Sequence, residues 1–267
     1  MAQRGNRKES RGSRGGSSRQ ANPPVQPIRL NKFIADAGVT SRRDADELIR
    51  KGQVKVNGQL VTELGVKVLP SDKVTLKGKV LKPEQLRYVL LNKPKDFITT
   101  VTDTHNRKTV MQLVEKACVE RIYPVGRLDR HTTGLLLFTN DGDLAKKLTH
   151  PSHKVKKIYQ VELNKPITNQ HFDEILKGLM LEDGKVTVDE LALVGDDNAT
   201  LGIEIHVGKN RIVRRIFEHL GYKVQRLDRV MFGPLTKKDL PRGKWRHLSQ
   251  REINVLKSLV GRGNTEL

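Results

Sequence analysis

A polar loop that runs straight into a short apolar segment limits the possible folds of this chain more than any other stretch. Residues 123–142 read YPVGRLDRHTTGLLLFTNDG. The apolar run Leu135–Phe138 has the length of a buried strand. The Asn140-Asp-Gly142 sequence that follows is typical of a turn that ends a strand. The pattern therefore predicts a buried strand with a polar loop at its entrance.

The same loop holds one acidic residue, Asp129, between Arg127 and Arg130. A carboxylate flanked by cations stays ionised and well positioned, as a carboxylate nucleophile must be. Because the rest of the chain is strongly basic, an acid held among positive charges indicates chemistry on a nucleic acid.

The overall charge supports that setting. The formal net charge is +20 over 267 residues, and a charge of this size indicates a polyanionic partner. We find neither an 18-residue apolar run nor a signal-peptide pattern, so we expect no membrane partner. The single cysteine, Cys118, excludes an intramolecular disulfide and fits a reducing cytoplasm. Its neighbours follow a helical pattern, which favours a buried structural thiol.

Composition divides the chain into four parts. Residues 1–27 are rich in Arg, Gly and Ser and nearly free of large apolar side chains, which predicts a disordered basic tail. This tail could touch RNA non-specifically or serve only to keep the chain soluble. We expect a small module with its linker over 28–87, a larger domain over 88–258 and a C-terminal tail over 259–267.

The small module combines two helices with short strands. Apolar residues spaced at i, i+3, i+4 and i+7 predict a helix over residues 30–37. Ser41, with Asp44 three residues later, resembles a capping box that opens a second helix. Alternating valines lead to Asn57-Gly58, the strongest short hairpin signal, and a return strand follows. Further short strands are expected at 66–69 and 74–76, before a linker over 79–85.

Basic residues lie off the apolar faces of these two helices. Such a face can simply be solvated. However, the sequence RLNKFIADAGVTSRRDADELI, followed by VKVNG, closely resembles the S4 RNA-binding domain. The resemblance implies binding of structured RNA, with contacts from Lys32, Arg42, Arg43 and Lys51.

In the larger domain, strand and helix patterns alternate irregularly. Strands are expected at 88–91, 158–163 and 202–207, and helices at 172–178 and 211–220. The steady repeat of a parallel doubly wound sheet is missing. We therefore expect an α+β fold with a mixed, mostly antiparallel sheet and flanking helices.

The second of these helices carries three arginines on one side. Asn210 is its expected N-cap and Gly221 its expected C-terminal glycine. Arg211, Arg214 and Arg215 lie at i, i+3 and i+4. They repel one another unless a phosphate, an active-site carboxylate or solvent screening relieves the charge.

Four motifs in order complete the pattern: KP at 93–94, GRLDRHTTGLLL at 126–137, KIY at 157–159 and GKNRIVRR at 208–215. Across roughly residues 28–255, the chain resembles pseudouridine synthases. The resemblance is to the ribosomal small-subunit/large-subunit uridine branch, which carries an N-terminal S4 domain. It implies isomerisation of a specific uridine in ribosomal RNA, with large-subunit RNA favoured.

The resemblance also implies residue roles. Asp129 would be the catalytic aspartate, Tyr159 would pack on the target base, and Arg214 would form an ion pair that keeps Asp129 ionised. Attack at C1′, glycal formation and addition to C6 all remain open as routes. Tyr159 lies in an alternating strand pattern, where a tyrosine can equally be cross-strand packing. The remaining expected RNA contacts are Lys93, Arg127, Arg130, His131, Lys209, Arg211 and Arg215.

His131 could contact the RNA backbone or be a plain exposed loop residue.

Three further patterns are discounted. Asp228, in a second RLDR sequence, is expected to form structural ion pairs rather than a catalytic acid pair. His150 and His153 lack further metal ligands nearby. Gly202 to Lys209 has the wrong spacing for a phosphate-binding loop.

We thus expect no metal, no cofactor and no nucleotide, and a monomer that binds ribosomal RNA or a ribosomal subunit precursor. Whether the substrate is naked RNA or an assembling particle stays open, as does the target uridine. The alternative is a non-catalytic RNA-binding factor for ribosome assembly.

Overall fold

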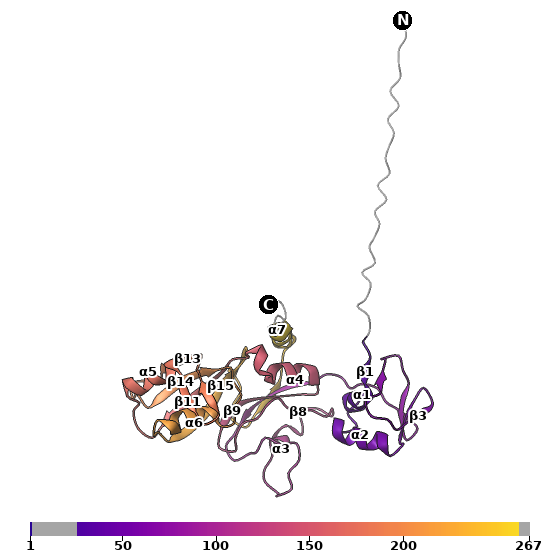
Figure 1. The fold of residues 1–267 in the computed structure, drawn as a ribbon, viewed down its shortest axis with the longest axis horizontal. Helices are drawn as coiled ribbons and strands as arrows, with labels where there is room; N and C mark the ends of the chain where they lie inside the picture. Colours follow the sequence, from indigo (N-terminus) through magenta and orange to yellow (C-terminus); the bar gives the residue numbers. More distant parts are fainter. Residues whose placement is uncertain (2–25, 262–267) are drawn as a thin grey trace.

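The structure is a computed structural model, and it describes residue 1 and residues 26–261 (Figure 1). The expected N-terminal tail lies almost wholly outside the described residues. At the other end, helix α7 (Gln250–Gly261) continues past residue 258, where we expected the larger domain to end. Within the described residues, no helix is both long enough and apolar enough to cross a membrane.

The small module is built as the sequence predicts. Its elements are α1 (Leu30–Asp36), α2 (Arg42–Arg50) and a sheet ordered β3 (Gln59–Val61), β2 (Val54–Val56), β5 (Val74–Leu76) and β6 (Lys79–Val80), while β1 (Ile28–Arg29) pairs with β4 (Lys67–Val68). The Ser41 hydroxyl accepts a hydrogen bond from the Asp44 amide and caps α2. Asn57 and Gly58 both have positive φ, as their hairpin turn requires. The expected linker is partly wrong, because β6 extends the sheet there.

A nine-stranded sheet organises the larger domain. Its main order is β13 (Glu190–Leu193), β14 (Thr200–Ile205), β10 (Lys157–Leu163), β15 (Val224–Phe232), β9 (Thr133–Thr139), β7 (Tyr88–Lys93) and β17 (Trp245–His247). At its margins, β8 (Tyr123–Pro124) pairs with β9 and β16 (Leu235–Thr236) with β15. Among its described pairings only β9 with β15 is parallel. The expected mixed, mostly antiparallel sheet is confirmed.

Helices cover both faces of this sheet. They are α3 (Val110–Val114), α4 (Gly142–Thr149), α5 (Asn169–Lys177), α6 (Ile212–His219) and α7; a short hairpin of β11 (Leu179–Leu181) and β12 (Gly184–Val186) and a 3₁₀ turn, η1 (Pro151–His153), complete the domain. In Figure 1, α4 and α7 lie above the sheet and α3 lies below it. Leu136 and Phe138 of β9 pack in the core with α3, α5 and α6, whereas Leu135 and Leu137 pack with α4 and α7. The run is apolar throughout because both faces are buried.

Two local expectations need correction. Helix α6 begins at Ile212, and its N-cap is Arg211 in a left-handed conformation (φ +47°) rather than Asn210. Cys118 lies beyond the end of α3 and is half-buried, not part of a longer helix. Burial raises the pKa of its thiol, which agrees with a structural role.

Candidate active site

A cavity of about 440 Å³ opens where the loop before β9 meets β10, β15 and the loop before α6. Asp129 and Tyr159 both line it, although they come from separate motifs. Three of the predicted RNA contacts line it as well: Arg127, Lys209 and Arg211. The chain thus brings three of the four motifs to one site.

Close contact between β9 and β15 fixes the start of the strand behind Asp129. Gly134 pairs with Arg229 on β15 and has φ +105°. A Cβ atom at Gly134 would lie 2.2 Å from the Arg229 carbonyl oxygen. Only glycine fits this position, since the space and the backbone conformation both exclude a side chain.

Lys93, the lysine of the first motif, holds the loop from within. Its side chain is fully buried (0% exposed). The ammonium donates hydrogen bonds to the carbonyl oxygens of Pro94 (3.1 Å), Asp129 (3.1 Å), Arg130 (3.2 Å) and Thr132 (2.8 Å). The expectation that Lys93 contacts RNA is therefore wrong: its donors are used inside the protein, where they shape the Asp129 loop.

The Asp129 carboxylate makes no hydrogen bond or ion pair within the described chain, so its oxygens are available to a substrate. Two buried cations lie in its field. Burial lowers the pKa of Lys93 to about 8, and the Asp129 charge opposes that shift. Burial likewise lowers the pKa of Arg214, again opposed by Asp129. Lys93 and Arg214 thus add positive charge near Asp129 from within the protein, besides Arg127, which lines the same cavity.

Arg214 does not form the expected direct ion pair. Its side chain is buried (8% exposed) and donates to the carbonyl oxygen of Val224 at 3.0 Å. No carboxylate lies within ion-pair distance of it in the described part of the chain. It acts on Asp129 through its charge at longer range.

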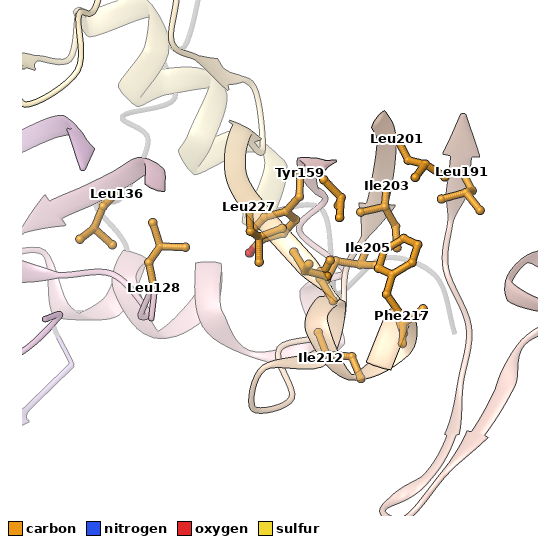
Figure 2. Close-up of a cluster of buried hydrophobic side chains, with 14 of the residues drawn as sticks. Leu128, Leu136, Tyr159, Leu191, Leu201, Ile203, Ile205, Ile212, Phe217 and Leu227 are labelled. Atoms are coloured by element: carbon orange, nitrogen blue, oxygen red, sulfur yellow. The ribbon is translucent and has the colours of Figure 1, made fainter. Parts of the chain in front are cut away.

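The position of Tyr159 is compatible with both roles that the sequence leaves open. It sits on β10, between Ile203 of β14 and Arg229 of β15, and belongs to the apolar core. It also lines the cavity. In Figure 2 its ring lies beside Leu227, another cavity residue. Cross-strand packing thus holds the ring rigidly at the cavity wall.

Sequence reasoning missed two cations in this cavity. Lys157 donates to the His206 carbonyl oxygen at 2.6 Å, and burial together with the Arg229 charge lowers its pKa to about 8. Arg229 is 4% exposed, donates to the Leu135 carbonyl oxygen at 2.8 Å and lies 3.5 Å from the Tyr159 hydroxyl. Lys157 opens the KIY motif, and Arg229 closes the second RLDR sequence.

Other predicted contacts lie outside the cavity lining. Arg130 and His131 approach Asp96 at 3.4 and 3.5 Å, and both are exposed. Arg215 forms an ion pair with Asp183 at 2.5 Å. These side chains are accessible at the surface but are not brought to Asp129.

In the small module, the basic residues separate into two groups. Lys32 forms an ion pair with Asp143 of α4 at 2.6 Å and thus ties the module to the larger domain. Arg42, Arg43 and Lys51 are exposed and make no ion pair within the described residues. The resemblance to an RNA-binding face fits these three better than Lys32.

Asp228, which the sequence analysis discounts as a catalytic acid, forms the structural ion pairs expected of it. Asp228 accepts hydrogen bonds from Arg242 and Thr133 (2.7 Å each) and pairs with Lys237. Despite burial, these partners lower its pKa to about 2, so its role is structural. Among the described residues, no group of three or more acidic, histidine or cysteine side chains could hold a metal.

In comparisons with known proteins, the small module and the larger domain match two different families. The RNA pseudouridylate synthase family matches residues 87–219, and the S4 domain matches residues 28–74. A protein of Aquifex aeolicus, named as an RNA pseudouridine synthase, is 42% identical over 89% of this chain and 96% of its own length. The ribosomal large subunit pseudouridine synthase B of Bacillus subtilis is 41% identical over 88% of this chain and 98% of its own.

Among solved structures, a crystal structure of a pseudouridylate synthase superposes with a TM-score of 0.61 at 31% identity. The superposition covers 86% of this chain and 99% of the pseudouridylate synthase chain. Identity at this level over nearly the whole described length, with the motif residues gathered around one cavity, decides the family. The chain belongs to the RNA pseudouridylate synthases, which are isomerases, and it carries an S4 domain ahead of the synthase domain.

Proposed function

We propose that this protein converts a specific uridine of ribosomal RNA to pseudouridine, with large-subunit RNA as the favoured substrate and Asp129 as the nucleophile. The observation that carries the proposal is the Asp129 carboxylate, unpaired within the described chain and placed in one cavity with Tyr159. The naming of the Bacillus subtilis relative as a large-subunit enzyme favours that RNA.

The reaction divides into steps that these residues can serve. The bond between C1′ and N1 breaks, the uracil rotates, C1′ joins C5, and the C5 proton leaves. A free carboxylate at Asp129 can attack C1′, assist a glycal or add to C6, and all three routes stay open. The base must first leave its stack at a cost of a few kcal/mol, and the rigid Tyr159 ring offers it a new surface.

The charges around the cavity suit this chemistry. The uracil that separates from C1′ carries negative charge, and Lys157 and Arg229 lie in the wall of the same cavity. Preorganised cations stabilise developing negative charge more strongly in a partly dry site than in water. Because the isomerisation changes no oxidation state and transfers no phosphoryl group, we expect it to need no cofactor.

The alternative is a non-catalytic RNA-binding factor that acts on a ribosomal subunit precursor. An unpaired acid in one cavity with a buried tyrosine favours the enzyme, because a binder has no use for a carboxylate facing a polyanion. For either function we place the protein in the cytoplasm as a monomer, with ribosomal RNA or a subunit precursor as its partner.

Tritium release from ribosomal RNA labelled at uridine C5 tests this proposal. We expect release with the native protein, none with Asp129→Ala or Asp129→Asn, and nearly unchanged RNA affinity for both variants. Asp96→Asn is the matched control, because Asp96 is an exposed carboxylate near the same loop. Tight binding without release, on naked RNA and on subunits alike, would favour the assembly factor.

A further inference from the structure

A second cavity, of about 780 Å³, lies between the S4 domain and the synthase domain. From the S4 domain, Ser41 and Arg42 line it at the start of α2. From the synthase domain, its walls include Thr99, Thr100, Arg121 and Lys146. We call this cavity the interdomain groove.

The groove gathers four cations that form no direct ion pair within the described residues. Arg42, Arg121, Arg127 and Lys146 line it, and none of their side chains makes a hydrogen bond or ion pair with another described residue. Some arginines elsewhere in the described chain do pair with carboxylates: Arg107 with Asp103, Arg215 with Asp183 and Arg246 with Glu252. Four unpaired cations around one hollow repel one another, so the groove favours an anionic occupant.

The acidic residues of the groove do not cancel the positive charge of its lining. Its carboxylates are Asp36 and Asp143. Lys32 donates a hydrogen bond to Asp143 at 2.6 Å and lies 3.9 Å from Asp36. Lys32 thus offsets part of the acidic charge, and the four cations dominate the remaining wall.

The groove also joins the active site. Gly126 and Arg127 line both cavities, and Arg127 lies two positions before Asp129. A ligand in the groove therefore reaches the rim of the cavity that holds Asp129. The hydroxyls of Ser41, Thr99 and Thr100 also line the groove, but each already donates its one proton inside the protein, to Asp44, Leu128 and Thr102 respectively. The donors left for phosphate oxygens are therefore those of the four cations.

We propose that the interdomain groove binds the sugar–phosphate backbone of the RNA strand that adjoins the target nucleotide. This inference rests on the proposed function and names where the strand lies. Arg42 holds the strand from the S4 domain, and Arg121 and Lys146 hold it from the synthase domain. The two domains thus grip one strand, and Arg127 guides its next nucleotide towards Asp129.

The test compares the double variant Arg121→Gln/Lys146→Gln with the control Arg251→Gln/Lys177→Gln. The control removes the same two charges from exposed sites that line neither cavity. We expect the groove variant to raise KM for ribosomal RNA roughly tenfold with little change in kcat, because phosphate contacts hold the strand and do no chemistry. The slope of log Kd against log salt should fall by about 0.7–0.9 for each phosphate that the variant no longer neutralises.

The outcomes separate this inference from the proposed function. If the native protein releases tritium and the groove variant matches the control in KM and salt slope, the groove does not bind the strand. Weaker binding with an unchanged slope also overturns the inference, since the loss would then come from altered folding. If the native protein releases no tritium, the proposed function fails, while the salt slopes still decide whether the groove holds RNA.

Discussion

At the residue scale, the same type of basic side chain can bind RNA or form hydrogen bonds inside the protein, and its burial decides which. Lys93 belongs to a motif that suggests an RNA contact, yet its ammonium is enclosed by four backbone carbonyl groups. Leaving such carbonyls without a donor costs about 1–3 kcal/mol each. Lys93 is thus a positioning residue for the loop that carries Asp129.

Asp228 gives a prediction about pH. Its pKa in the folded protein is about 2, below the ordinary value of 3.8. A carboxyl group with a depressed pKa stabilises the fold above its unfolded pKa and loses that contribution as the pH falls towards the folded value. Asp228→Asn should therefore lower the free energy of unfolding at pH 7 by up to about 2 kcal/mol. The difference from the native protein should shrink between about pH 4 and pH 2.

Urea unfolding at a series of pH values measures this difference. Asp173→Asn serves as the control, because Asp173 is exposed and makes no ion pair within the described residues. A constant difference between native protein and Asp228→Asn across the whole range would show that the lost stability comes from packing rather than from charge.

At the element scale, the parallel contact of β9 with β15 holds the loop that carries Asp129 in place. Because β9 is buried on both faces, it cannot shift without exposing one of the two core clusters. Its first residues pair with Asp228 and Arg229 of β15. The cavity depends on this pairing, since Arg229 and Leu227 form part of its wall.

Gly134→Ala tests that pairing. The added Cβ atom meets the Arg229 backbone at 2.2 Å, so we expect a loss of stability on the order of 3 kcal/mol or more. Gly184→Ala is the matched control: Gly184 also has positive φ (+101°), but nothing lies within 4 Å of its Cβ position. In thermal unfolding, the melting temperature should fall much further for Gly134→Ala than for Gly184→Ala. An equal fall in both variants would mean that backbone conformation alone, and not the close approach of β15, requires glycine.

At the scale of the whole molecule, the S4 domain sits at the end of the synthase domain that carries β8 and α4 (Figure 1). The ion pair between Lys32 and Asp143 links the two domains next to the interdomain groove. Since the Asp143 side chain is largely exposed (68%), solvent screens this pair. Its contribution to the stability of the protein is therefore small.

A double-mutant cycle on Lys32→Met and Asp143→Asn should give a coupling of about 0.2–1 kcal/mol in the amide-exchange protection of α1. The control pair is Arg50 and Glu47, which lies within α2 and spans no domain boundary. Removing the control pair should leave the protection of α4 unchanged, whereas removing the interdomain pair should lower it. Unaltered protection of α4 in both cases would mean that the Lys32–Asp143 pair contributes nothing to the contact between the domains.

The sequence by itself determined the elements whose cause is local. The β9 strand, the Ser41 cap, the Asn57-Gly58 hairpin and the mostly antiparallel sheet follow from periodicity and turn chemistry, which act over a few residues. Motif order also indicated the family, and with it the pairing of Asp129 with Tyr159 in one site.

Only the tertiary structure decided which charges meet. Lys93 contacts carbonyl groups 36–39 positions away, and Arg229 approaches Tyr159 across 70 positions. The interdomain groove joins Arg42 to Arg121 and Lys146. A cation looks the same in the sequence whether it is buried, paired or free, because its partners are set by how distant segments pack. The partners of these side chains therefore follow from burial and from contacts between distant segments, which a local sequence pattern does not contain.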